Sequence, residues 1–255
     1  MTARFAGKVA LVTGGGTGIG RATALAFARE GATVMVAGRE PYELMETVEL
    51  IEKEGGVVDA IPADVTHSMD VMKVIRTTVE RHGGLDIAFN NTGAKGNPSP
   101  LAEVCEAAWG DLLSANLTAV WQLMKHEIAY MKDNGGGVII NTAANVGLHA
   151  RNTGFGAFAA STAALSTLTS AAAQEYIADG IRINAISPGS VDPELERSLA
   201  EQAVAAGPTT WAGADLPTDR IAKTDEVAST ILWLASDDAA FVVGHDMVLD
   251  VAVTF

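Results

Sequence analysis

Short apolar runs alternate along the chain with longer segments in which apolar residues recur every three or four positions. The short runs are rich in Val and Ile and end in Gly, Asn, Asp or Pro, which is typical of strands buried on both faces of a parallel sheet. They predict strands at 8–13, 33–37, 57–62, 87–90, 137–141, 182–187 and 247–250. The longer segments predict helices at 21–30, 41–54, 69–82, 108–134, 157–178 and 224–236.

The alternation of strands and helices indicates right-handed βαβ units and therefore an α/β fold. We expect a single-domain, Rossmann-like three-layer α/β/α sandwich over residues 1–255, with a doubly wound parallel sheet of about seven strands. The segment 192–218 has no clear strand and contains Pro193, Pro208 and Pro217. We expect this segment to be a lid-like insertion within the domain.

The amino-acid composition indicates which classes of partner are not expected and which cellular compartment the protein fits. Acidic residues outnumber basic ones by 31 to 17, and the formal net charge is −14. Such a surface repels phosphate backbones and anionic lipids, so neither nucleic acid nor a membrane is expected as a partner. The single cysteine excludes an internal disulfide and fits a reducing compartment. With no visible secretory signal and no apolar run of about 20 residues, we expect a cytoplasmic protein.

The segment 11–20, LVTGGGTGIG, places a series of glycines between a predicted strand and a predicted helix. Gly14 permits a tight turn, Gly18 lets the backbone approach a pyrophosphate, and Gly20 lets the helix pack closely on the strand. The free N–H groups at the start of the helix then face the phosphates. The other predicted cofactor contacts of this loop are Gly16, Thr17 and Ile19. A glycine-rich turn without a ligand is the alternative interpretation.

The residue after the second predicted strand distinguishes between the two nicotinamide dinucleotides. A carboxylate near this position would hold the adenosine ribose hydroxyls of NAD(H), but the segment VAGRE places Arg39 there. A guanidinium group can bind a 2′-phosphate through two hydrogen bonds. The sequence therefore favours NADP(H). NAD(H), or no nucleotide at all, stays open, because Arg39 beside Glu40 can equally be a solvated loop cation.

Further candidate contacts follow the third and fourth predicted strands. The carboxylate of Asp64 can accept the adenine amino group, with Val65 beside the ring. Asn91 can satisfy backbone groups of the loop, and Gly93 leaves room for a ribose. All of these residues lie at the carboxyl ends of strands, where open α/β sheets bind ligands.

Taken together, the motifs TGGGTGIG, ADV, NNTG, ANLTAV, GIRINAISPG and WLASDDAAFVVGH resemble those of the short-chain dehydrogenase/reductase family, from Gly7 to Asp250. The resemblance implies a Rossmann fold, a nicotinamide cofactor and a small-molecule substrate. It also implies a homodimer or homotetramer, since the family uses the helices matching 108–134 and 157–178 as a subunit interface. The cofactor contacts that it adds after the sixth strand are Pro188, Gly189 and Val191.

The catalytic positions depart from this family. Its members usually work with an Asn, a Ser, a Tyr that transfers the proton, and a Lys that lowers the pKa of that Tyr. Matched residue by residue, only the Asn is retained, as Asn116. Phe158 and Thr162 occupy the Tyr and Lys positions of the segment GAFAASTAAL. The Ser position falls at Asn145 or Ala144, depending on the direction of counting.

Three interpretations follow, and whether the chain is an enzyme stays open. In the first, it binds NADP(H) and a small organic substrate but performs altered chemistry such as isomerisation, cyclisation or elimination. His149 is then the candidate acid or base, although an exposed loop histidine is the plainer explanation. Asn145 would polarise a carbonyl oxygen, and the apolar pocket would contain Phe155, Phe158 and Trp211.

In the second interpretation, the chain is a non-catalytic nucleotide-binding protein or an oligomer partner. In the third, it is a weak or unusual NADP-dependent oxidoreductase in which water or a substrate group supplies the proton. General acid–base catalysis contributes about 10²–10⁴-fold to rates, so ordinary ketone reduction is not expected without the Tyr. No interpretation requires a metal ion.

Overall fold

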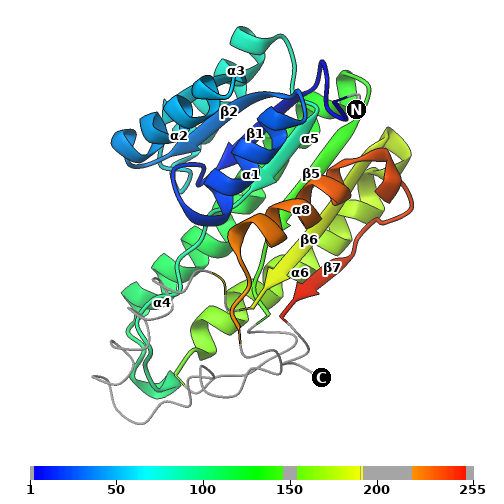
Figure 1. Cartoon of the computed structure of the whole chain (residues 1–255). Helices are drawn as coiled ribbons and strands as arrows, with labels where there is room; N and C mark the ends of the chain where they lie inside the picture. Colours follow the sequence, from blue (N-terminus) through cyan, green and yellow to red (C-terminus); the bar gives the residue numbers. More distant parts are fainter. Residues whose placement is uncertain (1–2, 146–153, 190, 192–219, 251–255) are drawn as a thin grey trace.

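The computed structural model describes residues 3–145, 154–189, 191 and 220–250 (Figure 1). Its sheet has seven parallel strands in the order β3-β2-β1-β4-β5-β6-β7. The order reverses between β1 and β4, as expected of a doubly wound sheet. The strands are β1 (Val9–Thr13), β2 (Thr33–Gly38), β3 (Val57–Pro62), β4 (Ile87–Asn90), β5 (Gly137–Thr142), β6 (Ile181–Pro188) and β7 (Asp246–Leu249).

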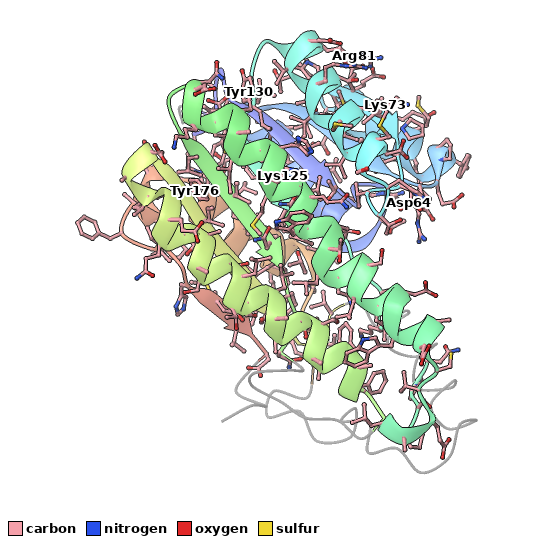
Figure 2. The ribbon with its side chains drawn as sticks, turned by 180° about the vertical axis from the view of Figure 1, so that it is seen from behind. Asp64, Lys73, Arg81, Lys125, Tyr130 and Tyr176 are labelled. Carbon is pink, nitrogen blue, oxygen red and sulfur yellow. The ribbon has the colours of Figure 1, made fainter. Side chains whose placement is uncertain are left out.

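Helices cover both faces of this sheet, and the predicted three-layer α/β/α fold is confirmed. One layer contains α1 (Gly18–Arg29), α2 (Pro41–Lys53) and α8 (Thr224–Ala235). Figure 2 shows the other layer, with α3 (Ser68–His82), α5 (Ala119–Asp133) and α6 (Gly156–Tyr176). The shorter elements are α4 (Glu106–Leu113), η1 (Leu101–Glu103), η2 (Ser114–Thr118), η3 (Ile177–Asp179) and η4 (Asp237–Ala239).

Alternating residues of the strands supply two apolar cores, one on each face of the sheet. Val12 and Val36 pack beneath α1, α2 and α8, whereas Leu11 and Met35 pack beneath α3, α5 and α6. All four side chains are fully buried. Burying such a side chain contributes about 1.5–3 kcal/mol, and these two cores hold the carboxyl ends of the strands in a fixed arrangement.

The predicted strands differ from the observed ones by at most one residue at either end. One helix prediction was wrong: the segment 108–134 is not a single α-helix. The wider π-helical turn η2 separates α4 from α5, and it contains the buried side chain of Asn116. Such turns occur where a side chain is needed at a functional site. The predicted insertion at 192–218 lies outside the described residues.

None of the helices in the described ranges is long and apolar enough to cross a membrane.

Candidate functional site

A cleft of about 710 Å³ lies at the carboxyl ends of strands β1 to β5, next to the glycine loop. It brings together most of the residues that the sequence singled out. Those that line it are Gly14, Gly16, Thr17, Gly18, Ile19, Arg39, Asp64, Val65, Asn91, Gly93, Asn116, Phe158, Thr162 and Val191.

Other predicted site residues do not line this cleft. A side chain at Gly20 would collide with the carbonyl oxygen of Gly14, so this glycine permits close packing of α1 against the loop itself. Asn145 donates its backbone N–H to Pro188 and lies beside Gly189, while Phe155 is buried in an apolar cluster. His149 and Trp211 fall outside the described residues.

The space around the glycine loop differs between Gly14, which is crowded, and Gly18, which is open. Gly14 has a φ of +60°, and a side chain there would collide with the backbone oxygen of Asn91. Gly18 has a φ of +51°, and no atom lies within 4 Å of the position that its Cβ would occupy. The start of α1 therefore faces open space, and its free N–H groups fit a phosphate or pyrophosphate.

Two side chains behind the loop hold its carbonyl groups, and neither could be anticipated from the local sequence pattern. The hydroxyl of Thr47, on α2, donates to the oxygen of Gly15 at 2.9 Å. The guanidinium of Arg21 donates to the oxygen of Gly16 at 2.7 Å and to Thr47 at 3.1 Å. These contacts hold the loop through residues that do not line the cleft themselves.

Charged groups gather where β2 and β3 end. Arg39 lines the cleft together with the carboxylates of Glu40, Glu43 and Asp64. Asp64, labelled in Figure 2, accepts hydrogen bonds from the Thr66 hydroxyl at 2.7 Å and the Thr66 N–H at 3.0 Å. The hydroxyl contact is the largest cause that lowers the pKa of Asp64, and the charge of Arg39 is a smaller one. Asp64 is therefore an anionic acceptor at this end of the cleft.

Asn91 joins three strands at the floor of the cleft. Its backbone N–H donates to the hydroxyl of Thr13 at 3.0 Å, and its side-chain oxygen accepts from Thr142 at 3.3 Å. Thr13, Asn91 and Thr142 end or follow β1, β4 and β5, respectively. Asn91 thus has a structural role as well as a place on the cleft surface.

The amide of Asn116 is fully engaged by the protein. Its oxygen accepts the N–H of Ala94 at 2.7 Å, and its nitrogen donates to the oxygen of Ala94 and the hydroxyl of Ser161, both at 2.9 Å. Asn116 therefore connects the chain after β4 to the first turns of α6, where Phe158 lies.

Phe158 and Thr162 lie side by side on the buried start of α6. The Phe158 side chain belongs to an apolar cluster with Leu112 and Phe155. The Thr162 hydroxyl donates within its own helix, to the oxygens of Phe158 at 3.2 Å and Ala159 at 3.3 Å. Neither side chain carries a proton that titrates near neutral pH.

No tyrosine in the described ranges lines the cleft. Figure 2 shows Tyr130 and Tyr176 near the far ends of α5 and α6. By helix geometry Tyr176 lies roughly 27 Å along α6 from Phe158. Lys95, in contrast, does line the cleft, although it comes from the segment after β4. A lysine therefore belongs to this wall, which the sequence position alone did not reveal.

Known proteins resemble this chain over nearly all of its length. The profile of the family described as enoyl-(acyl carrier protein) reductase matches residues 14–254. Cyclohexanol dehydrogenase of Acinetobacter sp. (strain SE19) is 34% identical over 254 residues, covering 100% of this chain and 98% of that protein.

Solved structures show the same likeness. Levodione reductase superimposes with a TM-score of 0.90 at 30% identity, covering 98% of this chain and 99% of that one. NAD⁺-bound xylitol dehydrogenase also gives a TM-score of 0.90, at 28% identity, and covers 96% of this chain and 98% of that one. The sheet order, the glycine loop and these matches agree, and the chain belongs to the short-chain dehydrogenase/reductase family.

Proposed function

We propose that this protein binds a nicotinamide dinucleotide, NADP(H) in preference to NAD(H), and acts on a small organic substrate through a non-standard active site. The observation that carries the proposal is the cleft, which contains both the open glycine loop and the side chains of Phe158 and Thr162. One end suits a dinucleotide. The other end lacks the phenol and the ammonium group that the family uses at these two positions.

The dinucleotide would lie across the carboxyl ends of the strands. Its pyrophosphate would contact the N–H groups near Gly18, where the open space fits it. Asp64 and Val65 would hold the adenine. Bound there, the cofactor supplies or accepts a hydride, while the residues of this chain bind and orient it and its substrate.

Arg39 supports the preference for NADP(H). It is a cation on the wall where the adenosine ribose would lie, and a guanidinium group matches a phosphate in geometry and charge. Glu40 and Glu43 line the same part of the cleft and disfavour a second anion there. Arg39 must therefore outweigh them for the preference to hold.

The chemistry at the other end would not depend on a phenolic proton. Phe158 holds the position with a ring that cannot donate, and the Thr162 hydroxyl is directed to its own helix. A substrate oxygen there would meet Phe158 and the hydroxyl of Thr142. This surface suits binding and polarisation of a small ligand better than protonation of an alkoxide.

A slow or unusual oxidoreductase is the second candidate, and Lys95 favours it. Lys95 lines the same cleft, and its positive charge would stabilise a developing negative oxygen that came near it. Substrates that are already activated, or that carry their own proton donor, would then be reduced.

Titration with NADPH and NADH, followed by nucleotide fluorescence, tests the cofactor proposal. We expect NADPH to bind more tightly, and Arg39→Ser to reduce NADPH affinity by about 10–100-fold with little change for NADH. The matched control is Arg76→Ser, because Arg76 is an exposed cation on α3 away from the cleft. Binding of neither nucleotide would overturn the proposal, and equal losses for both would remove Arg39 as the 2′-phosphate ligand.

Location in the cytoplasm and assembly as a homodimer or homotetramer stay predictions. The same is true of a lid at 192–218 and of the roles of His149 and Trp211. Light scattering after gel filtration measures the assembly directly.

A further inference from the structure

A fully buried acid lies beneath the floor of the cleft. Glu127 is on α5, and its carboxyl has no exposed surface. The side-chain nitrogen of Asn90 donates to Glu127 Oε2 at 3.0 Å and to the oxygen of Asn141 at 3.0 Å. Asn141 in turn donates to the hydroxyl of Thr169, on α6, at 2.9 Å. These four side chains form a buried network. It joins α5 and α6 to Asn90 at the end of β4 and to Asn141 in the neighbouring strand β5.

Protonation of the Glu127 carboxyl improves the match between hydrogen-bond donors and acceptors in this network. Among the described residues, Glu127 Oε1 and Asn90 Oδ1 are buried without a hydrogen-bond partner, and both are acceptors when the carboxyl is ionised. A protonated carboxyl turns one of these acceptors into a donor. Burial, which outweighs the hydrogen bond from Asn90, raises the pKa of Glu127 to about 8. The acid is therefore neutral at pH 7.

Within the described ranges, no cation compensates the carboxyl from the elements packed around it. The strands β4 and β5 contain no ionisable side chain, and the acid of α6, Glu175, is exposed. The charged side chains of α3 that come nearest to Glu127 are exposed. Those of α5 itself are also exposed, apart from the half-buried His126. They are Lys73, Arg76, Glu80 and Lys125, of which Figure 2 shows Lys73 and Lys125.

The network reaches the cleft through the backbone. Asn90 and Asn141 face each other in the parallel ladder of β4 and β5. The residues that follow them, Asn91 and Thr142, line the cleft and are hydrogen-bonded to each other at 3.3 Å. Since successive side chains of a strand point to opposite sides, the buried pair and the cleft pair are two sides of the same strand ends.

We propose that Glu127 is a positioning residue, which in its neutral form clamps Asn90 and Asn141 and so fixes Asn91 and Thr142 at the floor of the nucleotide cleft. Loss of its proton leaves a buried anion with one hydrogen-bond donor, the side-chain nitrogen of Asn90, and no cation among the described residues; this loosens the ends of β4 and β5 and weakens binding in the cleft. The effect on nucleotide binding rests on the proposed function, whereas the clamp itself does not.

The test measures two quantities in the full-length protein from about pH 6.5 to about pH 9.5, a range that brackets the transition. One is the NADPH dissociation constant. The other is the protection of backbone amides against hydrogen exchange without nucleotide, corrected for the intrinsic exchange rate at each pH, over peptides spanning 87–94 and 138–145. The variants are Glu127→Gln, which keeps the shape without a titrating proton, and Glu127→Leu, which removes the hydrogen bond as well. Glu175→Gln, an exposed acid on α6, is the control.

We expect the wild type and E175Q to lose at least about five-fold in NADPH affinity on going to alkaline pH, within the range usual for coupled sites. Protection of the amides at the two strand ends should fall in the same interval. E127Q should show neither change, and E127L should bind weakly at every pH.

If E127Q, or E127L where E127Q does not fold, loses NADPH affinity with rising pH as the wild type does, the proposal is overturned. If the wild type binds no nucleotide at any pH, the proposed function fails. The exchange data then decide the clamp alone: protection that falls with pH only when Glu127 is present supports it, and identical protection in wild type and variant refutes it.

Discussion

The side-chain amide of Asn116 donates to the hydroxyl of Ser161 at 2.9 Å, while the same amide holds both backbone groups of Ala94. This residue therefore ties the cleft wall after β4 to the helix that contains Phe158. The family uses an Asn at this position in a proton relay, but in this chain all three of its contacts are internal.

Replacement of Asn116 should destabilise the protein more than replacement of its partner. Asn116→Ala leaves the backbone N–H and C=O of Ala94 without their partners, whereas Ser161→Ala leaves the Ala94 contacts intact. We expect a loss of about 2–4 kcal/mol in unfolding free energy for N116A and about 1 kcal/mol for S161A, measured by urea denaturation. Equal losses would show that Asn116 does not support the wall.

Restoring the missing pair should create ordinary reductase activity. The double variant Phe158→Tyr/Thr162→Lys places a phenol and an ammonium group at adjacent turns of α6, on the cleft. We expect NADPH-dependent reduction of a simple ketone such as cyclohexanone to rise by about 10²–10⁴-fold, the usual contribution of a positioned acid.

Thr162→Lys alone is the matched control, since it adds the charge without a proton donor. It should give a much smaller increase in rate. A wild-type rate already equal to that of the double variant would mean that another group supplies the proton, and the site would then be a working reductase.

Gly18 should be required for binding rather than for folding. Gly18 and Gly55 both have a positive φ, at 51° and 82°, and nothing lies within 4 Å of either Cβ position. Of these two glycines, Gly18 alone lines the cleft. Gly18→Ala and Gly55→Ala should each cost about 1–2 kcal/mol in stability, because an L-residue is strained in this region of φ.

Only Gly18→Ala should also weaken NADPH binding, because its methyl group enters the space left for the phosphates. Fluorescence titration and thermal unfolding of both variants separate the two effects. If G55A lost affinity as much as G18A, the loss would reflect general destabilisation.

The stability of the fold should fall as pH rises through the titration range of Glu127. Its pKa is about 8 in the folded protein against 4.5 in the unfolded chain. Between these values the folded state binds a proton that the unfolded state has released, so raising the pH favours unfolding. The contribution decreases by about 1.4 kcal/mol per pH unit and is fully lost above pH 8.

Glu127→Gln removes this contribution, so the difference in unfolding free energy between wild type and variant is the informative quantity. Denaturant unfolding at several pH values between about 5 and about 8 should give curves that diverge with the predicted slope. Parallel curves would show that Glu127 is ionised in the folded state.

The strands were predictable because their apolar runs are bounded by turn-forming residues and are buried on both faces. The break in the helix at Asn116 was not predictable, since the segment keeps a helical pattern of apolar positions throughout. The π-helical turn that interrupts it contains Asn116, whose amide is hydrogen-bonded to Ala94, a residue 22 positions earlier.

The residues of the candidate site also divide into those that the sequence predicts and those that it does not. Glycines and charged residues at strand ends, such as Gly18, Arg39 and Asp64, could be found from local context because strand ends converge in this fold. Lys95 and Glu127 could not. Lys95 is placed on the cleft by the path of a loop. In the sequence, Glu127 is indistinguishable from an ordinary charge in an amphipathic helix, and only the packing of α5 turns it inward.

The contacts of Thr47 and Arg21 with the glycine loop bear on how cofactor preference could change in this protein. The helix that begins just after Arg39 also contains Thr47, whose hydroxyl donates to the carbonyl oxygens of Gly15 at 2.9 Å and Gly16 at 3.4 Å. A substitution that shifts the start of this helix, to accept or reject a 2′-phosphate, would also move the support of the glycine loop. Changing cofactor preference at Arg39 and its neighbours would therefore require compensating changes around Thr47, and the two parts of the cleft would evolve together.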